Sequence, residues 1–571
     1  MKEIKQLLAQ AVNWAEQDPD QATQDELGAL IIRAQEGDEA AVTDLDDRFS
    51  GVLEFGTAGL RAELGAGPMR MNRMVVLRTA RGIARFLSAE ANGKYQPRVV
   101  IGYDARYNSD VFARDSAAVF HAAGFEVLLM PAALPTPVLA WAVRRFEAEA
   151  GIMVTASHNP PKDNGYKVYV GGRVAQETGR GAQIVSPIDA MISVLIDPDE
   201  HIDSIPRSVT GWSVLPGAGE AGDVEAEYLA AIHPVVAEQG ADREKLRVVV
   251  SAMHGVGGHT MKQALLDAGF SDIHMVAEQE EPDPDFPTVK FPNPEEPGAI
   301  DLSLTLARAV GADLVIANDP DADRCAAAIN DNGEWRMLRG DEVGWLLGDL
   351  LSRTLPEGKV LANSIVSSRM LAAIAKDAGR QHEETLTGFK WISRVENLGF
   401  GYEEALGYCV APELVRDKDG ISAGLMLADL AATLKAEGSS IARRLDVLAV
   451  KHGVHVTDQL SLRFTDLAKI AALMDKVRTD PPVHLGGSAI SEVTDLSQGS
   501  ENLPATDAIV LHTFSGDRVI IRPSGTEPKL KCYLETIEPV GEPSELPNSR
   551  RIANEQIAWI KEQLSEYLNA E

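Results

Sequence analysis

The stretch PRVVIGYDARYNSDVFARDSAAVFHAAGFEVLLM, residues 97–130, decides the fold class. A β-branched run near its start is followed by polar residues, a helical stretch and a second apolar run. Strand, helix and strand at this spacing are typical of a right-handed βαβ unit, whose two strands lie parallel in one sheet. The sequence therefore predicts an α/β domain in this region.

A β-branched run followed by a polar loop and a helical stretch recurs at residues 245–269 and 358–379. Two amphipathic helices precede the first unit, and Thr23 and Glu26 form a capping-box pattern before the second of them. Residues 508–537 are typical of strands joined by tight turns, and a helix is expected from about residue 551 to 568.

We thus predict three similar α/β domains with mixed sheets, followed by a smaller α+β C-terminal domain, all arranged around a central active-site cleft. The expected boundaries are 1–210 for domain 1 with its helical extension, 211–331 for domain 2, 332–445 for domain 3 and 446–571 for domain 4.

Composition is that of a soluble globular protein: the 571 residues are 45% hydrophobic and 24% charged. No apolar run reaches the roughly 18 residues that a membrane helix needs, and the first 17 residues alternate charged with apolar side chains. Three widely spaced cysteines predict neither a disulfide framework nor a zinc site. We expect a cytoplasmic protein without a membrane partner.

The net charge of -31 argues against nucleic acid and anionic membrane as partners, because both would be repelled. An anionic substrate would have to be bound by a local cluster of positive side chains. Small molecules are therefore the expected partners.

The stretch TASHNPPKDNGYK, residues 155–167, follows a short apolar run that predicts a buried strand. Ser157 would emerge at the carboxyl end of that strand, where open α/β sheets bind their ligands. Two interpretations are open: Ser157 is a turn residue, or its hydroxyl carries a phosphoryl group, with Lys167 nearby as a cation.

A second stretch, DPDADR at residues 319–324, ends another predicted strand. Alternation on an extended loop would point the carboxylates of Asp319, Asp321 and Asp323 the same way, as a divalent cation with oxygen ligands requires. The alternative is a solvated acidic turn. If a metal binds, a phosphate on Ser157 could complete its coordination and Arg324 could contact that phosphate.

Two further loops carry arginines. RPSGTEPKLK, residues 522–531, offers Arg522 and the backbone amides of Ser524, Gly525 and Thr526 as an anion site, or else forms a simple hairpin turn. FGTAGLRAELGAGPMRMN, residues 55–72, is a glycine-punctuated loop that bears Arg61.

Taken together, these motifs resemble the α-D-phosphohexomutases, the phosphoglucomutase and phosphomannomutase superfamily, from about residue 50 to 540. Four motifs match in order, one in each expected domain: the phosphoserine loop, the metal loop, a sugar-binding loop at GYEEALGY (401–408) and the phosphate-binding loop. The resemblance implies the following roles: Ser157 as phosphoserine and metal ligand, Asp319, Asp321 and Asp323 as Mg²⁺ ligands, Lys167 as general acid/base, Arg61, His158 and Arg324 around the transferred phosphate, and Arg522, Ser524, Gly525 and Thr526 around the other phosphate.

The resemblance is strongest to the branch that contains phosphopentomutase and glucose-1,6-bisphosphate synthase. It carries over Glu404, Lys390 and Lys418 as substrate contacts. Many hexomutases have Glu-x-Ser in the sugar loop, whereas Ala405 and Leu406 follow Glu404 here, so the sugar preference stays open.

The resemblance implies a mutase that interconverts the 1- and 6-phosphates of glucose or mannose, with Mg²⁺ and a sugar bisphosphate such as glucose 1,6-bisphosphate as activator. The alternatives within the family are phosphopentomutase and glucose-1,6-bisphosphate synthase. Two rivals from other classes are a metal-dependent phosphatase and a non-catalytic sugar-phosphate sensor. By analogy we expect a monomer.

Overall fold

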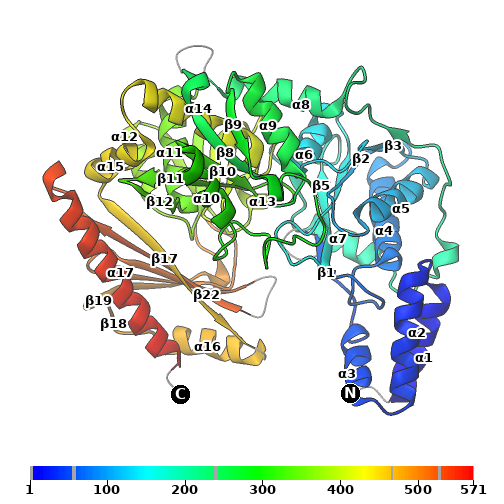
Figure 1. Cartoon of the computed structure of the whole chain (residues 1–571). Helices are drawn as coiled ribbons and strands as arrows, with labels where there is room; N and C mark the ends of the chain where they lie inside the picture. Colours follow the sequence, from blue (N-terminus) through cyan, green and yellow to red (C-terminus); the bar gives the residue numbers. More distant parts are fainter. Residues whose placement is uncertain (1–3, 55–58, 237–241, 465–466, 525–528, 570–571) are drawn as a thin grey trace. The chain divides into compact units, whose positions relative to one another are not determined.

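The computed structural model describes residues 4–54, 59–236, 242–464, 467–524 and 529–569 (Figure 1). The chain divides into two compact units, which we describe separately. Unit 1 comprises Met1–Ala328 with Cys409–Asp429, and unit 2 comprises Ile329–Tyr408 with Leu430–Glu571.

Unit 1 begins with three helices, α1 (Ile4–Gln17), α2 (Gln21–Gln35) and α3 (Glu39–Arg48). The predicted capping box is wrong, because α2 starts three residues earlier: Asp20 is its N-cap and accepts a hydrogen bond from the Ala22 N–H. Thr23 instead donates its hydroxyl to Asp18. The helices pack on the first domain, since Leu7, Leu27 and Leu45 belong to the same buried core as its strands.

A seven-stranded mixed sheet forms the centre of the first domain. Its order is β1 (Leu60–Glu63), β5 (Asp163–Val170), β4 (Ala150–Val154), β2 (Arg98–Tyr103), β3 (Glu126–Leu129) and β7 (Ser213–Val214), with β6 (Ala182–Gln183) paired to β5. The central strands β4, β2 and β3 are parallel, whereas β5 runs antiparallel to both β4 and β1. The helices of this domain are α4 (Arg73–Ala91), α5 (Ser109–Ala122), α6 (Thr136–Arg145) and α7 (Ile188–Leu195). The predicted βαβ unit of residues 97–130 is confirmed by β2, α5 and β3.

The second sheet of unit 1 contains β11 (Cys325–Asp331), β10 (Leu314–Asn318), β8 (Arg247–Ser251) and β9 (Asp272–Met275) in this order. Strand β8 is parallel to both β9 and β10. Three helices belong to this region: α8 (Val224–Ile232), α9 (Gly257–Asp267) and α10 (Asp301–Val310). The segment Cys409–Asp429 adds the first part of α14 (Gly420–Ala436) to unit 1.

Unit 2 contains two sheets. The first has the order β14 (Gln381–Thr385), β13 (Val360–Ser364), β15 (Leu398–Glu403) and β16 (Gly407–Cys409), with β13 parallel to β14 and β15. The helices of this region are α11 (Gly340–Thr354), α12 (Met370–Asp377), α13 (Phe389–Ile392) and α15 (Ile441–His452), whereas β12 (Glu334–Met337) pairs with β11.

The last sheet is antiparallel throughout. Its order is β17 (Val454–Arg463), β22 (Lys529–Glu538), β21 (Arg518–Pro523), β20 (Ile509–Thr513), β19 (Ser488–Asp495) and β18 (His484–Leu485). Two helices accompany it, α16 (Leu467–Thr479) and α17 (Leu546–Asn569), and α17 packs along β17 and β22 (Figure 1). Helix α17 begins five residues before the expected start because Leu546 is buried in this core.

Three α/β regions with mixed or parallel sheets and a C-terminal antiparallel sheet agree with the predicted fold class. All three cysteines are buried and free. Among the described residues, no helix combines the length and the apolar character that crossing a membrane would require.

Candidate active site

Ser157 lies in the loop that connects β4 to β5. Its backbone adopts a left-handed conformation, with φ of 51°, and its N–H donates to Thr155 Oγ1 at 2.9 Å. A non-glycine residue pays roughly 1 kcal/mol or more for this conformation, which that hydrogen bond helps to offset. The turn directs the Ser157 side chain inward, where only 2% of the residue is exposed.

The Ser157 hydroxyl contacts two polar side chains. It donates to Asp319 Oδ2 at 2.8 Å and lies 3.2 Å from His158 Nδ1. Burial, together with the positive charges of Arg324 and Arg61, holds the pKa of His158 well below its usual range. The imidazole is therefore neutral at physiological pH and has a ring nitrogen that can accept a proton.

Asp319, Asp321 and Asp323 follow the end of β10, and one carboxylate oxygen from each lies within 4.8 Å of the others. The backbone is a turn and not the expected extended loop: Ala322 has a φ of 54° and donates its N–H to Asp319 O at 2.8 Å. The side chains nevertheless converge as predicted. All three aspartates are buried.

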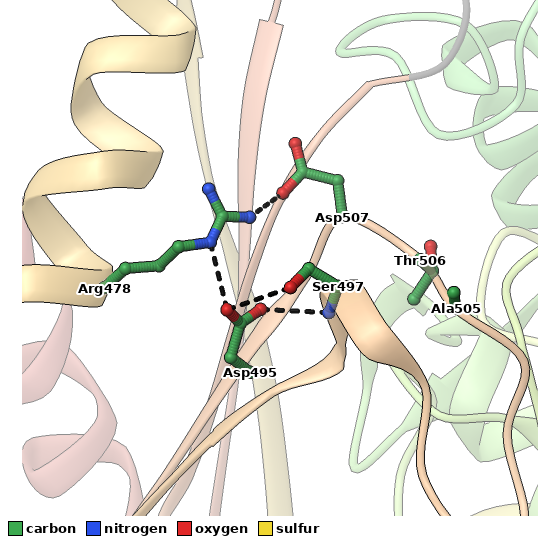
Figure 2. Close-up of a pocket in the computed structure, with 6 residues that line it drawn as sticks. All are labelled: Arg478, Asp495, Ser497, Ala505, Thr506 and Asp507. Carbon is green, nitrogen blue, oxygen red and sulfur yellow. Dashed lines mark hydrogen bonds and ion pairs between the residues drawn. The ribbon is translucent and has the colours of Figure 1, made fainter.

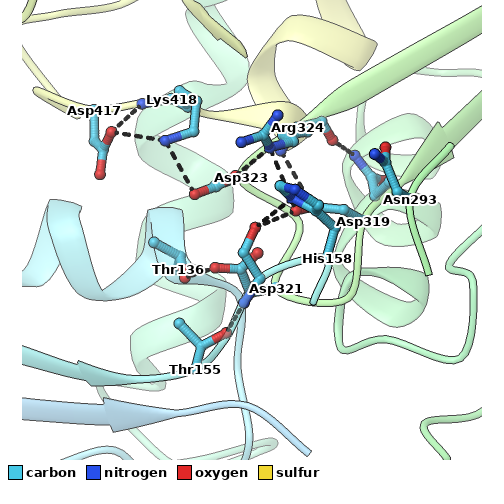
Figure 3. Close-up of polar contacts among 12 residues, drawn as sticks. Thr136, Thr155, His158, Asn293, Asp319, Asp321, Asp323, Arg324, Asp417 and Lys418 are labelled. Atoms are coloured by element: carbon cyan, nitrogen blue, oxygen red, sulfur yellow. Dashed lines mark hydrogen bonds and ion pairs between the residues drawn. The ribbon is translucent and has the colours of Figure 1, made fainter. Parts of the chain in front are cut away.

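Two ammonium groups reach into this cluster of carboxylates, and Figure 3 shows that of Lys418. Lys167 Nζ donates to Asp321 Oδ2 at 2.7 Å and to Asp323 Oδ2 at 2.8 Å, and Lys418 Nζ lies 3.2 Å from Asp323 Oδ2. Burial alone would lower the pKa of Lys167, but Asp321 and Asp323 raise it above its ordinary value. Lys167 is thus protonated.

The three carboxylates differ in their pKa values. Burial and the charges of Asp321 and Asp323 raise the pKa of Asp319 well above its usual range. Burial has the same effect on Asp323, but Lys167, Lys418 and Arg324 outweigh it and lower the pKa of that carboxyl. A divalent cation would favour the ionised form of all three groups.

The carboxylates also have oxygens available for a cation. Within the part of the chain that the structure describes, Asp321 Oδ1 and Asp323 Oδ1 are buried and accept no hydrogen bond. Buried carboxylate oxygens rarely stay without a partner. Three converging carboxylates are the hard ligands that Mg²⁺ prefers, so these residues fit a Mg²⁺ ion.

Two arginines lie beside the cluster. Arg324 Nε is 3.8 Å from Asp319 Oδ2 and 3.7 Å from Asp323 Oδ1 (Figure 3). Arg61 projects from β1, which pairs with β5, and donates to Asn159 Oδ1 at 2.9 Å in the Ser157 loop. Ser157, His158 and the two arginines thus come together in unit 1 with the aspartates.

Lys418 is held by a polar network of its own. Asp417 Oδ1 lies 3.4 Å from Lys418 Nζ, while Asp417 Oδ2 accepts hydrogen bonds from the Tyr169 hydroxyl at 2.6 Å and from Gln183 Nε2 at 2.8 Å. The structure therefore places Lys418, which the resemblance assigns to the sugar, against the cluster of three carboxylates. Asp417 was not among the residues predicted from the sequence.

Thr136 is a further residue that the sequence analysis missed. It begins α6, and its Oγ1 donates to Asp321 Oδ2 at 2.7 Å while its N–H donates to Asp321 O at 2.9 Å. Thr136 thereby orients both the backbone carbonyl and the carboxylate of Asp321. The only local signal is that the PTP sequence at 135–137 is typical of a helix start.

We expect Thr136→Val to weaken Mg²⁺ or Mn²⁺ binding about tenfold, because loss of a group that orients a metal ligand has effects of this size. Valine keeps the shape and the backbone N–H. Thr136→Ser keeps the hydroxyl and should bind the metal as the unchanged protein does. Isothermal titration with Mn²⁺ measures the affinity, and equal affinities for the valine and serine variants would contradict the role of the hydroxyl.

The predicted sugar-loop residues lie in unit 2. Glu404 Oε2 accepts hydrogen bonds from the hydroxyls of Ser364 at 3.0 Å and Ser367 at 2.9 Å, which fix the carboxylate. Leu406 has a φ of 62° and is fully buried. Gly340 permits the close packing of α11 here, because a Cβ at this position would lie 1.8 Å from Glu404 O.

The remaining predicted contacts are also in unit 2. Arg522 lies on β21 and, with Glu404, influences Tyr533: burial and Glu404 raise the pKa of that phenol, whereas Arg522 lowers it. Ser524 donates its N–H to Lys529 O at 2.8 Å. Lys390 lies on α13 with its Nζ 5.9 Å from the centre of the Trp391 ring. Gly525 and Thr526 lie outside the described residues.

A hollow of about 560 Å³ on the C-terminal domain contains none of these residues (Figure 2). Its lining consists of Arg478, Asp495, Ser497, Ala505, Thr506 and Asp507. The guanidinium of Arg478 pairs with Asp495 at 3.2 Å and also with Asp507. Because two carboxylates neutralise this cation, the hollow is poorly suited to a phosphate.

Models of one protein family match the chain in four consecutive segments. They describe Phosphoglucomutase/phosphomannomutase, with alpha/beta/alpha domain I at residues 52–189, domain II at 226–333, domain III at 339–448 and the C-terminal domain at 462–539. Together they cover more than half of the chain.

Individual proteins are also similar. A Haemophilus influenzae protein named "Probable phosphomannomutase" is 45% identical over 82% of this chain and 93% of its own length. Human "Phosphopentomutase" is 35% identical over 97% of this chain and 95% of its own length. A phosphoglucomutase/phosphomannomutase family protein from Burkholderia thailandensis has a solved structure with the same fold: the TM-score is 0.64 at 21% identity, covering 88% of this chain and 97% of that one.

Proposed function

The chain belongs to the phosphoglucomutase/phosphomannomutase superfamily, the α-D-phosphohexomutases. From this premise we propose that it interconverts the 1- and 6-phosphates of glucose or mannose through phosphorylated Ser157. Membership makes it a phosphomutase, an enzyme of the isomerase class. The observation that carries the finer proposal is the buried Ser157 hydroxyl, 2.8 Å from Asp319 within a cluster of three aspartates and two lysines.

In the first half-reaction the phosphoryl group moves from Ser157 to a free hydroxyl of the bound sugar monophosphate. The bond from phosphorus to Ser157 Oγ breaks, a bond from phosphorus to the sugar oxygen forms, and the net proton movement is from the sugar hydroxyl to Ser157 Oγ. The second half-reaction returns the other phosphate of the resulting bisphosphate to Ser157 and reverses the proton movement.

The residues around Ser157 support these steps. Near Ser157, neutral His158 would act as the proton acceptor and protonated Lys167 as the proton donor; the lowered pKa of His158 makes it a weak base and the raised pKa of Lys167 makes it a weak acid. Arg61 and Arg324 would stabilise negative charge on the transferred phosphoryl group. A Mg²⁺ ion held by the phosphate on Ser157 and by Asp319, Asp321 and Asp323 would neutralise further charge on the phosphoryl oxygens.

We further propose that Arg522, Ser524, Gly525 and Thr526 bind the phosphate that is not being transferred. The bisphosphate has to be bound in two orientations, and in each of them one of its phosphates is not being transferred. One anion site can therefore serve both half-reactions. Glu404, with Lys390 and Lys418 as weaker candidates, would contact the sugar.

A second candidate function is that of a phosphopentomutase. Two observations favour it: the human phosphopentomutase aligns with 97% of this chain, and the buried Leu406 offers the sugar no hydroxyl at a position where many hexomutases have serine. Pentose 1- and 5-phosphates would then be the substrates of the same Ser157 chemistry. Glucose-1,6-bisphosphate synthase is a third variant of that chemistry, and a protein of this name is 33% identical over 86% of the chain.

The test is a ³¹P NMR time course with Mg²⁺, a trace of glucose 1,6-bisphosphate and equal amounts of glucose 1-phosphate, mannose 1-phosphate and ribose 1-phosphate. Conversion of one sugar to its 6- or 5-phosphate is expected and identifies the preferred substrate. Inorganic phosphate as the sole product would mean that the protein is a phosphatase. Binding without any conversion would mean that it is a sensor.

A further inference from the structure

Arg106 lies between β2 and α5, and its guanidinium is directed at the backbone of the Ser157 loop. Nη2 donates to Ser157 O and Asn159 O, each at 2.6 Å, and Nη1 donates to Pro160 O at 2.8 Å and Asp163 O at 3.1 Å. Only 4% of Arg106 is exposed. One side chain thus binds four carbonyl groups of a single loop.

The loop itself supplies a second donor to one of these carbonyls: Pro160 O also accepts the Asp163 N–H at 3.0 Å. Two adjacent prolines, Pro160 and Pro161, lack backbone N–H groups. The Asn159 N–H donates to Ala156 O at 3.1 Å, which is not one of the four carbonyls that Arg106 binds. Carbonyl groups in such a place need a donor, because leaving them unpaired costs about as much as losing a hydrogen bond.

Arg106 is itself fixed from two sides. Its Nε lies 3.4 Å from Asp104 Oδ2, and Asp104 Oδ1 accepts hydrogen bonds from the Arg106 N–H at 3.0 Å and from Ser109 Oγ at 2.7 Å. The ring of Phe286, which is 2% exposed, lies with its centre 5.0 Å from the guanidinium carbon. The fork of donors is therefore held in one orientation before any substrate binds.

The peptide groups on both sides of the Ser157 side chain are consequently constrained. Thr155 accepts the Ser157 N–H and Arg106 binds the Ser157 carbonyl, while the residue stays in its left-handed conformation. The fixed backbone sets the position of the Ser157 Cβ atom, from which Oγ donates to Asp319 Oδ2 at 2.8 Å. We propose that Arg106 is a positioning residue, which sets the orientation of Ser157 for phosphoryl transfer without touching the substrate; this role rests on the proposed function.

The test compares Arg106→Lys with Arg78→Lys. Lysine keeps the positive charge beside Asp104 but lacks the planar fork of donors. Arg78 is a matched control because it is also buried, donates from Nε to a carbonyl, that of Glu200, at 3.0 Å, and lies over the ring of Trp14 at 5.1 Å. Within the described part of the chain, its hydrogen bond and ring contact involve neither the Ser157 loop nor the three aspartates.

In Arg106→Lys we expect kcat to fall about 100-fold with little change in KM, because a displacement of about 1 Å at the reacting atom costs this much. Labelling of Ser157 by ³²P-glucose 1,6-bisphosphate should slow by the same factor. Arg78→Lys should keep both rates. An unchanged kcat in Arg106→Lys, or an equal loss in both variants, would overturn the proposal.

Hydrogen exchange provides a readout that does not need activity. Peptides that cover residues 155–163 should exchange faster in Arg106→Lys than in the unchanged protein or in Arg78→Lys, and unchanged exchange there would overturn the proposal. If the unchanged protein had no mutase activity, the proposed function would fail, whereas this measurement would still decide whether Arg106 orders the loop.

A milder variant covers the case in which Arg106→Lys does not fold. Phe286→Leu removes the aromatic face and leaves every hydrogen bond of Arg106 in place. It should show the same effects, a lower kcat and faster exchange at residues 155–163, with smaller size. If Phe286→Leu changed neither quantity, the proposal would be wrong.

Discussion

Ser157→Ala is expected to abolish mutase turnover while the chain stays folded. The proposed mechanism passes every phosphoryl group through this one oxygen, and loss of a nucleophile of this kind lowers kcat by about 10⁴-fold or more. The folded state loses the hydrogen bond to Asp319, a change of about 1 kcal/mol. Measurement of mutase turnover by ³¹P NMR, together with intact mass after incubation with glucose 1,6-bisphosphate, should show neither product nor phosphoprotein.

Two further variants make this result specific. Ser157→Gly removes the same hydroxyl and relieves the left-handed backbone, so it should be as inactive as the alanine variant and melt at least as high. Ser352→Ala removes another buried hydroxyl, which donates to Asp349 O within α11 at 2.8 Å, and should keep full turnover. Normal turnover in either Ser157 variant would show that another group carries the phosphoryl.

Most of the site residues that could be predicted in unit 1 lie within two short sequence motifs. Ser157, His158 and Lys167 lie within one short motif, and Asp319, Asp321, Asp323 and Arg324 lie within another. Each motif follows an apolar strand, so its place at a sheet edge could be predicted from hydrophobic pattern alone. The structure places the two motifs against each other, although their roles in the reaction stay predictions.

The residues that the sequence analysis missed act on partners far along the chain. Thr136 binds Asp321, 185 positions away, and Arg106 binds the carbonyl of Ser157, 51 positions away. Neither residue carries a local pattern that identifies its partner: the Thr136 pair forms only when two sheets are folded, and the Arg106 pair forms only when β2 and β4 lie side by side in one sheet. Because every residue has a backbone carbonyl, the sequence does not indicate which carbonyls a side chain such as Arg106 will bind.

For the fold too, features that depend on local sequence pattern could be predicted better than features that depend on competing contacts. Apolar periodicity predicted the βαβ unit of residues 97–130 and the antiparallel sheet near the C-terminus, since both depend on local pattern. The start of α2 was misplaced because two acidic residues precede it: Asp20 caps the helix, and Asp18 takes the hydroxyl of Thr23, the expected cap.

The second large effect is expected at the metal site, where Asp323→Asn should lower mutase activity about 10³-fold, or about 4 kcal/mol of transition-state stabilisation. The substitution removes a negative charge that faces Lys167, Lys418 and Arg324. The positive side chains would then outweigh the two remaining carboxylates and repel a divalent cation. Mn²⁺ titration should show much weaker binding, and the unchanged protein should lose activity with EDTA and regain it with Mg²⁺.

Asp313→Asn is the matched control, because Asp313 lies just before β10, at the end opposite to the metal loop, and accepts the Arg247 N–H at 2.8 Å. An asparagine oxygen can accept the same hydrogen bond, so this variant should keep its metal affinity and activity. If Asp323→Asn retained its Mn²⁺ affinity, the carboxylates would serve only to neutralise the positive charges of the two lysines and would not bind a divalent cation. The same conclusion would follow if EDTA left the unchanged protein fully active, since a buried triad that needed Mg²⁺ could not work without it.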